Sequence, residues 1–298
     1  MTTLANPATK SANGHPVTDR PFHHFTVDVE EYFQVSALEP YVDRSQWEAW
    51  PTRVRASTEA LLDLLDAKQM RGTFFVLGWI AERYPALVRE IEQRGHEVAS
   101  HGTDHRRVTF LTPAEFRTSV RDSKSILEQV TGQKILGYRA PSFSIVSGRE
   151  WALDILAEEG YAYDSSLYPV RRSGYGYTAA RPHPYVIRTE SGRLLEFPPA
   201  TLQMFGAKLP AGGGAYLRLL PGSLIRSALK QAERRGYPAT LYIHPWEVDP
   251  EQPRVDVPVL TRIRHYGRLK RTFARLQRLC EDFTFRAIAD SLTSVNQA

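Results

Sequence analysis

The chain has 298 residues, 42% of them hydrophobic, and a formal net charge of +5. This length and apolar content fit one large α/β domain or two small ones with a sizeable core. No run of about 18 apolar residues occurs, which excludes a hydrophobic membrane-spanning helix. The N-terminus lacks the apolar stretch of a signal peptide, and the single cysteine, Cys280, excludes an internal disulfide. We therefore expect a cytoplasmic protein.

In chain order, residues 1–20 are rich in Thr, Ala, Asn and Pro, which predicts a disordered tail. From Phe22 to Ile243 short apolar runs alternate with helical periodicity, a pattern that predicts a parallel α/β sheet or barrel. Residues 169–214 are rich in Gly, Pro and Tyr and lack helical periodicity, which indicates a hairpin insertion with short strands near Val186 and Leu195. The predicted strands are 25–29, 72–77, 97–100, 135–138, 161–165, 239–243 and 283–285, and the predicted helices are 53–69, 80–91, 112–130, 151–159, 219–235 and 269–279.

Ionisable side chains follow five of these strands at the point where each strand ends. In a parallel α/β barrel the C-terminal ends of the strands face the active site. We therefore expect these side chains to converge on one site. They are Asp28 and Glu30, His101 and His105, Arg139, Asp164, and His244.

The two histidines His101 and His105 are four residues apart, so both imidazoles can reach one metal ion if the backbone between them turns. With one carboxylate they form a three-ligand site with an open position, which is typical of catalytic zinc; cobalt and nickel are the alternatives. Asp28 and Glu30 alternate along an extended chain and point the same way. One of them can bind the metal while the other takes a proton from the bound water. Glu31 is the alternative ligand, although the alternation favours Glu30.

Three further residues fit amide or ester hydrolysis. His244 arrives from another strand and can protonate a leaving amine. Arg139 can orient one carboxylate through a bidentate pair. Trp246 lies close enough to His244 in the sequence to line the same cleft.

Five ordered motifs resemble those of the NodB-type polysaccharide deacetylases, which form carbohydrate esterase family four. The resemblance covers residues 22–246 and implies a distorted (β/α) barrel with seven strands, within a single domain at 21–298 that ends in an extension at 247–298. That extension resembles the C-terminal part of deacetylases encoded in exopolysaccharide loci alongside exosortase (PEP-CTERM) sorting systems. The motifs lie at 27–31, 100–105, 139–143, 164–166 and 243–245, with support from 73–79 and 95–105.

The resemblance also implies residue roles. Asp28 matches the catalytic base, Arg139 the arginine that pairs with it, and His101 and His105 the metal-binding pair. His244 matches the catalytic histidine of the family, and Asp164 matches the acid that adjusts the pKa of this histidine.

Three positions depart from the family pattern, and one of them is Gly102, which replaces the usual Ser or Thr between the two histidines. Many members place a second aspartate on the metal where this chain has Val29, so Glu30 is the nearest candidate ligand. Tyr242 replaces a leucine that precedes the catalytic histidine, which bears on the acetyl pocket. We expect Pro141, Tyr242 and Trp246 to contact the substrate.

These observations lead to a metal-dependent N-deacetylase acting on N-acetylhexosamine residues of an exopolysaccharide or its precursor. The alternatives are an amide hydrolase for a lipid-linked sugar or small molecule, and a carbohydrate-binding relative without catalysis. Nucleic-acid binding has no supporting motif. Seven basic residues and no acid lie between Arg262 and Arg278, which suits either a solvated helix face or peripheral contact with the inner membrane.

Overall fold

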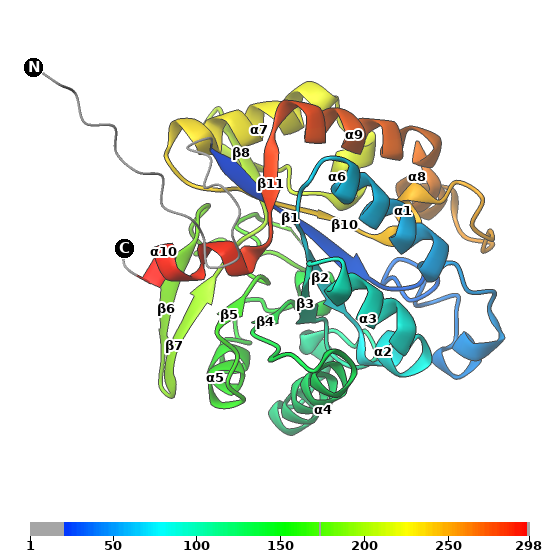
Figure 1. The fold of residues 1–298 in the computed structure, drawn as a ribbon, viewed down its shortest axis with the longest axis horizontal. Coiled ribbons are helices and arrows are strands. Elements are labelled where there is room, and N and C mark those ends of the chain that lie inside the picture. The colour runs from blue at the N-terminus through cyan, green and yellow to red at the C-terminus, as the bar shows by residue number, and fades with distance from the viewer. Residues whose placement is uncertain (1–20, 173, 297–298) are drawn as a thin grey trace, which may run out of the picture.

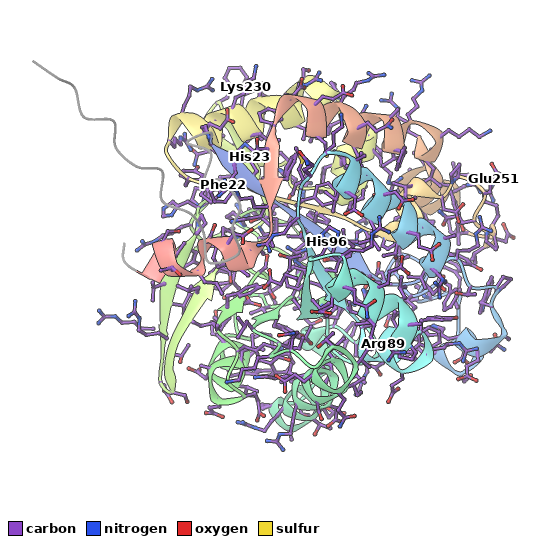
Figure 2. The ribbon with its side chains drawn as sticks, in the orientation of Figure 1. Phe22, His23, Arg89, His96, Lys230 and Glu251 are labelled. Carbon is purple, nitrogen blue, oxygen red and sulfur yellow. The ribbon has the colours of Figure 1, made fainter. Side chains whose placement is uncertain are left out.

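A computed structural model describes residues 21–172 and 174–296, so the tail expected at residues 1–20 lies outside the described residues. Helices lie around the outside of a central sheet (Figure 1). Of the residues labelled in Figure 2, His23 and His96 are buried, whereas Arg89, Lys230 and Glu251 are exposed. Among the described residues, no helix is long and apolar enough to cross a membrane.

The described residues place nine strands in one sheet. Seven of them run parallel in the order β10-β1-β2-β3-β4-β5-β7, while β6 pairs antiparallel with β7 and β11 pairs parallel with β1. The strands are β1 (Phe22–Val29), β2 (Thr73–Val76), β3 (Glu97–Ser100), β4 (Gly137–Tyr138), β5 (Tyr163–Asp164), β6 (Tyr185–Thr189), β7 (Gly192–Glu196), β10 (Thr240–Ile243) and β11 (Thr284–Arg286). A separate hairpin contains β8 (Thr201–Met204) and β9 (Ala207–Pro210).

The two edges of the parallel sheet approach each other. Just after β7, Pro199 forms a parallel bridge with Thr240 of β10, and the Ala200 amide donates to the Thr240 carbonyl at 2.9 Å. The seven parallel strands therefore curl into a barrel that one short bridge closes. This α/β architecture with seven parallel strands is the one that the sequence predicts.

The helices are α1 (Val54–Ala67), α2 (Gly78–Arg83), α3 (Pro85–Gln93), α4 (Pro113–Thr131), α5 (Trp151–Glu158), α6 (Gly214–Leu219), α7 (Gly222–Arg234), α8 (Val259–Tyr266), α9 (Thr272–Asp282) and α10 (Leu292–Asn296). Local sequence explains several of their boundaries. Thr112 and Glu115 form a capping box at the start of α4, with Pro113 in the first helical position. Pro85 begins α3, so the single helix expected at 80–91 is divided into α2 and α3.

Two expectations about the C-terminal half need correction. Residues 169–214 are not only an insertion, because β7 lies beside β5 in the main sheet and buries Leu194 and Leu195. The basic residues between Arg262 and Arg278 do not share one helix, because Gly267 follows the end of α8 and a 3-10 turn (Leu269–Arg271) separates it from α9. Arg275 turns inward and donates to the Leu220 carbonyl at 2.8 Å, so it caps the end of α6.

The C-terminal segment covers the end of the barrel where the strands begin. Ile288 packs with Phe75, Tyr163 and Phe197 in a buried apolar cluster. Its amide donates to the hydroxyl of Thr73, the first residue of β2, at 2.8 Å. This end of the barrel is therefore filled, and the opposite end, where the parallel strands finish, is left for a site.

Candidate metal centre and active site

Strand β1 positions the two acidic residues of the site. Asp28 lies near the end of the strand and Glu30 directly after it, and both are buried. Glu31 faces another way: it accepts hydrogen bonds from the amides of Arg53 and Val54, at the start of α1. The expected alternation therefore places Glu30 in the site and makes Glu31 a helix cap.

A tight turn after β3 aims both histidines at Glu30. Gly102 and His105 adopt left-handed backbone angles, with φ of 77° and 58°, and a left-handed angle is readily adopted by glycine and costly for histidine. His101 donates from Nδ1 to the Arg139 carbonyl at 2.8 Å, which leaves its Nε2 free to bind a metal. His105 Nε2 lies 2.8 Å from Glu30 Oε2. The turn thus provides the geometry that the four-residue spacing requires.

The ligand atoms of Glu30, His101 and His105 lie within 4.8 Å of one another, and all three residues are buried. Oε2 of Glu30 is buried, and although His105 Nε2 lies 2.8 Å away, no group among the described residues donates to it with hydrogen-bond geometry. Such an atom is costly unless a cation or donor satisfies it. Two imidazole nitrogens and one carboxylate oxygen form a donor set that suits a divalent ion such as zinc. The residues present therefore fit the metal that this kind of site requires.

Protonation states support the same fit. Burial lowers the pKa of His101 to about 4, so its imidazole is neutral at neutral pH, as metal binding needs. Burial acts to raise the pKa of Glu30, but His105, His244 and His101 outweigh it and hold that pKa at about 2. Glu30 is therefore ionised.

Arg139 follows β4 and is fully buried beside Asp28. Its NH1 nitrogen donates to Asp28 Oδ1 at 2.6 Å and to Thr26 Oγ1 at 2.7 Å, and its NH2 nitrogen donates to Ser165 Oγ at 2.8 Å. The guanidinium carbon lies 4.1 Å from the centre of the Phe75 ring. The expected pair with Asp28 is therefore present, but it uses one nitrogen, because the other nitrogens bind Ser165. Asp28 Oδ2 stays available to the cavity.

His244 follows β10 and faces both acids. Its Nε2 lies 3.6 Å from Glu30 Oε1 and 3.8 Å from Asp28 Oδ2. Its Nδ1 lies 2.8 Å from Glu247 Oε2, and the other Glu247 oxygen lies 2.6 Å from Arg218 Nε. Burial acts to lower the pKa of His244, but Glu30, Glu247 and Asp28 raise it to about 9. His244 therefore carries a proton at neutral pH and can donate it.

The resemblance implies that Asp164 tunes His244, but the carboxylate that lies beside Nδ1 of His244 belongs to Glu247. Asp164 instead accepts from the hydroxyl of Ser166 at 2.6 Å and lies beside Glu196 of β7. Burial raises the pKa of Asp164, and burial together with Asp164 raises that of Glu196. Ser166 in turn accepts from the Ala140 amide at 2.8 Å, so Asp164 supports the segment that carries Arg139.

A local signal for Glu247 was present in the sequence. Residues 244–247 read His-Pro-Trp-Glu, with proline first and glutamate third in a short 3-10 helix (Pro245–Val248). Glu247 reaches back to the amide of His244 at 3.0 Å, as Glu115 does to Thr112 at the start of α4. The same capping pattern that predicts α4 could therefore have identified the partner of His244.

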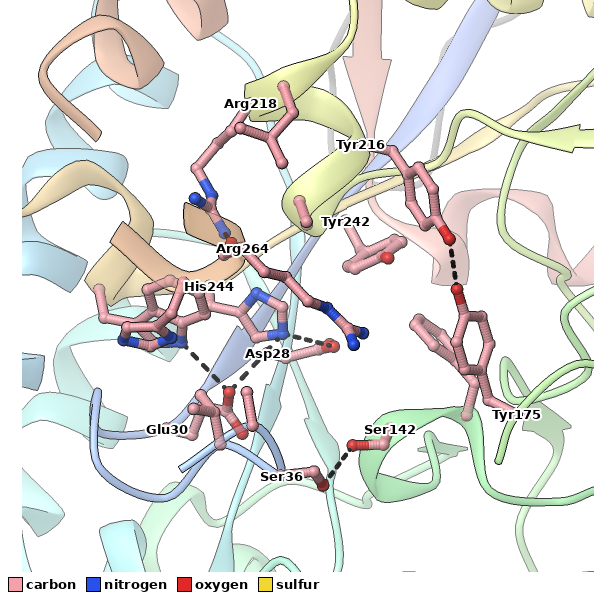
Figure 3. Close-up of a pocket in the computed structure, with 18 of the residues that line it drawn as sticks. Asp28, Glu30, Ser36, Ser142, Tyr175, Tyr216, Arg218, Tyr242, His244 and Arg264 are labelled. Atoms are coloured by element: carbon pink, nitrogen blue, oxygen red, sulfur yellow. Dashed lines mark hydrogen bonds and ion pairs between the residues drawn. The ribbon is translucent and has the colours of Figure 1, made fainter. Parts of the chain in front are cut away.

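The site opens into a cavity of about 500 Å³ (Figure 3). Of the expected substrate-contacting residues, Tyr242 and Trp246 line it, whereas Pro141 is buried behind the lining residues Ser142 and Phe143. His265, which the sequence gave no reason to select, also lines the cavity. Its ring stacks on that of Trp246 with centres 4.3 Å apart.

Comparisons with known proteins agree with this geometry. Residues 46–162 match the polysaccharide deacetylase family, and residues 165–293 match a domain of unknown function, DUF3473. The chain is 29% identical over 98 residues to a peptidoglycan-N-acetylglucosamine deacetylase of Bacillus cereus, covering 33% of this chain and 36% of that protein. It is 29% identical over 105 residues to a chitooligosaccharide deacetylase of Bradyrhizobium, covering 35% and 46%. The chain thus spans less than half the length of these curated relatives.

Two crystal structures share the fold over nearly the whole chain. A Mycobacterium smegmatis protein assigned to the polysaccharide deacetylases gives a TM-score of 0.62 at 21% identity, covering 98% of this chain and 96% of the other. The PuuE allantoinase gives 0.57 at 20% identity, covering 97% of each chain. At these identities the likeness concerns the fold. In sequence, residues 46–162 resemble the polysaccharide deacetylases and residues 165–293 resemble the DUF3473 domain, and the two matches are adjacent along the chain.

Proposed function

We propose that this protein is a metal-dependent hydrolase that removes acetyl groups from N-acetylhexosamine residues. The observation that carries the proposal is the buried cluster of Glu30, His101 and His105, which meets Asp28 and His244 at the open end of the barrel. Metal ligands, a free carboxylate oxygen and a protonated imidazole are the groups that amide hydrolysis needs.

A divalent ion bound by Glu30, His101 and His105 would supply Lewis acidity for the attacking water and for the acetyl carbonyl. Asp28 takes the proton from the attacking water through Oδ2, while Arg139 holds its other oxygen. His244 then gives its Nε2 proton to the departing sugar amine. Glu247 keeps the His244 ring in place by binding Nδ1, the role that a carboxylate plays beside many catalytic histidines.

The finer features of the proposal rest on the sequence resemblance. We take the substrate to be an exopolysaccharide or its precursor, as in deacetylases of exosortase-associated loci, and the metal to be zinc, with cobalt or nickel as substitutes. We place the protein in the cytoplasm. The cavity of about 500 Å³ is within the range usual for small-molecule sites and suits sugar units of a chain.

The direct test is metal analysis combined with acetate release from N-acetylglucosamine oligomers, for the wild type and for His101→Ala. The expected result is about one transition metal per chain and acetate release in the wild type, both lost in the variant. Metal binding without acetate release would favour a smaller or lipid-linked amide. Sugar binding that persists in Asp28→Asn, without turnover in either protein, would favour a binding protein and overturn the proposal.

One surface feature favours contact with a lipid bilayer during the reaction. Helix α8 exposes Val259, Leu260 and Ile263, which are 65%, 82% and 53% accessible. They lie on one side of the helix by their spacing, and Arg264 and His265 of the same helix line the cavity. The exposed basic residues Arg268, Lys270 and Arg271 follow directly. Apolar side chains flanked by cations suit an anionic membrane surface, so this feature favours the second candidate function, an amide hydrolase for a lipid-linked sugar, with α8 resting on the inner membrane.

A further inference from the structure

Two arginines of the cavity wall have no acidic partner. Arg172 and Arg264 both line the cavity, and across residues 21–172 and 174–296 neither guanidinium forms an ion pair with a carboxylate. The other arginines at the site are neutralised: Arg139 binds Asp28, and Arg218 binds Glu247. The cavity therefore presents two unpaired positive charges that catalysis does not use.

Both guanidinium groups lie near the tyrosine pair Tyr175 and Tyr216 in the cavity wall. Figure 3 shows the Arg264 side chain directed into it, between Asp28 and the pair formed by Tyr175 and Tyr216. Those two hydroxyls are hydrogen-bonded at 2.5 Å, and the Arg172 guanidinium carbon lies 5.9 Å from the centre of the Tyr216 ring. Burial and Tyr216 raise the pKa of Tyr175, whereas Arg264 and Arg172 both act to lower it. Both positive charges are thus near the same hydroxyl.

Both arginines are exposed, and other exposed arginines of the described residues, such as Arg171 and Arg278, also form no ion pair. Arg172 and Arg264 differ from these in that both line the same cavity. Two positive charges that line one cavity repel each other, and an anion bound between or beside them offsets this repulsion. A planar guanidinium can form two parallel hydrogen bonds with a carboxylate or phosphate group. The concave cavity wall also strengthens the positive electrostatic potential that the arginines produce. A neutral acetamido sugar needs no such charge.

We propose that Arg172 and Arg264 form an anion subsite, which binds a carboxylate or phosphate group carried by the same molecule as the acetamido sugar. This inference rests on the proposed function and narrows its substrate to an anionic one. Both arginines belong to the DUF3473 region at residues 165–293. That region therefore selects the substrate by charge, in addition to supplying His244 and Glu247.

The test compares the binding of three probes by titration calorimetry at low salt, in an Asp28→Asn background that prevents turnover. One probe is neutral (an N-acetylglucosamine tetrasaccharide), one carries carboxylates (a tetrasaccharide alternating N-acetylglucosamine and glucuronate), and one carries phosphates (UDP-N-acetylglucosamine). We expect one of the anionic probes to bind about tenfold more tightly than the neutral one. Whichever binds more tightly identifies carboxylate or phosphate as the natural group.

Three substitutions assign the preference to the subsite. Arg264→Gln and Arg172→Gln should each remove most of it, without weakening the neutral probe. Arg262→Gln is the matched control, because it removes one positive charge from α8 at a residue that does not line the cavity. Equal binding of neutral and anionic probes to the protein with both arginines intact would overturn the proposal. So would an equal loss in the control, because it would show a general charge effect.

Acetate release by the protein with Asp28 intact separates this proposal from the proposed function. If no probe releases acetate but the anionic preference depends on Arg264, the deacetylase proposal fails and the anion subsite stands. If the neutral and anionic saccharides release acetate with equal kcat/KM, the deacetylase proposal stands and the anion subsite fails.

Discussion

Nδ1 of His244 lies 2.8 Å from Oε2 of Glu247, and the other oxygen of that carboxylate lies 2.6 Å from Nε of Arg218. Burial acts to raise the pKa of Glu247, but Arg218 and His244 outweigh it and keep the pKa below its usual value. Glu247 is therefore a charged, fixed anchor for the imidazole. The anchor lies three residues after the histidine and belongs to the same 3-10 turn.

We predict that Glu247→Gln lowers kcat by about 10²- to 10⁴-fold with little change in KM, because the imidazole loses its orientation and the charge that stabilises its protonated form. The check is steady-state acetate release. Asp164→Asn is the matched control and should keep kcat within a fewfold, because Asp164 contacts Ser166 rather than His244. Since Glu247→Gln also leaves Arg218 unpaired, thermal unfolding must show that the variant is folded. The opposite ranking of the two variants would restore Asp164 to the role that the resemblance implies.

The metal site should depend on Glu30 and not on its neighbour. We predict that Glu30→Gln lowers metal affinity strongly, because it removes the only carboxylate of the three-ligand cluster. The loss should exceed the ~10- to 100-fold that is typical when a residue that only supports a metal ligand is replaced. Glu31→Gln should retain the metal and lose stability, since Glu31 accepts from amides at the start of α1. Elemental analysis and competition with a chelating dye would measure both. Loss of metal in Glu31→Gln alone would contradict the assignment.

Arg139 should not be replaceable by lysine. A lysine keeps the charge but cannot reach Thr26, Asp28 and Ser165 together, as the guanidinium does. We predict that Arg139→Lys lowers the free energy of unfolding by about 1–3 kcal/mol and lowers kcat by more than tenfold. Arg121→Lys, at an exposed ion pair, should change stability by less than about 1 kcal/mol. Urea unfolding at neutral pH would measure both, and equal stabilities would rule out the structural role.

Stability should fall in mild acid because of His24, which lies within β1. Its ring nitrogens lie 3.2 Å from Thr240 Oγ1 and 2.8 Å from Ser291 Oγ. Burial and the neighbouring His23 lower the pKa of His24 to about 3, from an ordinary value of 6.5. Below pH 6.5, His24 therefore binds a proton in the unfolded chain but stays neutral in the folded chain. As a result, the free energy of unfolding decreases with falling pH until the pH reaches about 3.

The contribution of this one group is at most about 1.4 kcal/mol per pH unit. We predict that His24→Gln, whose amide can still bond Thr240 and Ser291, reduces the pH dependence of the unfolding free energy between pH 7 and pH 4.5. The reduction should correspond to about one fewer proton bound on unfolding. Denaturant unfolding across that range is the measurement. An unchanged slope would show that His24 does not remain neutral in the folded protein.

The proposed membrane contact predicts a selective effect of apolar residues on α8. Leu260→Asn combined with Ile263→Asn should reduce binding to phosphatidylglycerol-containing vesicles by about tenfold or more. Phe110→Asn is the control, because Phe110 is also exposed, at 65%, but lies before α4. Vesicle sedimentation would measure the difference. Equal binding to neutral phosphatidylcholine vesicles, or equal loss in the control, would argue against an anionic bilayer as the partner of α8.

The residues from which the site is built can be identified from the amino-acid sequence alone. Apolar runs that end in Asp28, His101 and His244 show where parallel strands finish, because burial of such runs is a local requirement. The alternation of side chains along β1 also predicts which of Glu30 and Glu31 enters the site. Proline and glutamate at the start of α4 fixed that boundary for the same local reason.

Which of these residues contact one another depends on the folded arrangement of the strands. Arg139 and Asp28 are 111 positions apart, and their contact depends on strand order and on the pairing of β1 with β2 and of β3 with β4. Strand order likewise brings Asp164 to Glu196 instead of His244, because β7 lies beside β5. The arginines Arg172 and Arg264 belong to no motif, and their significance arises from the cavity wall that they share. Such contacts between distant residues follow from how the barrel closes, which no local pattern encodes.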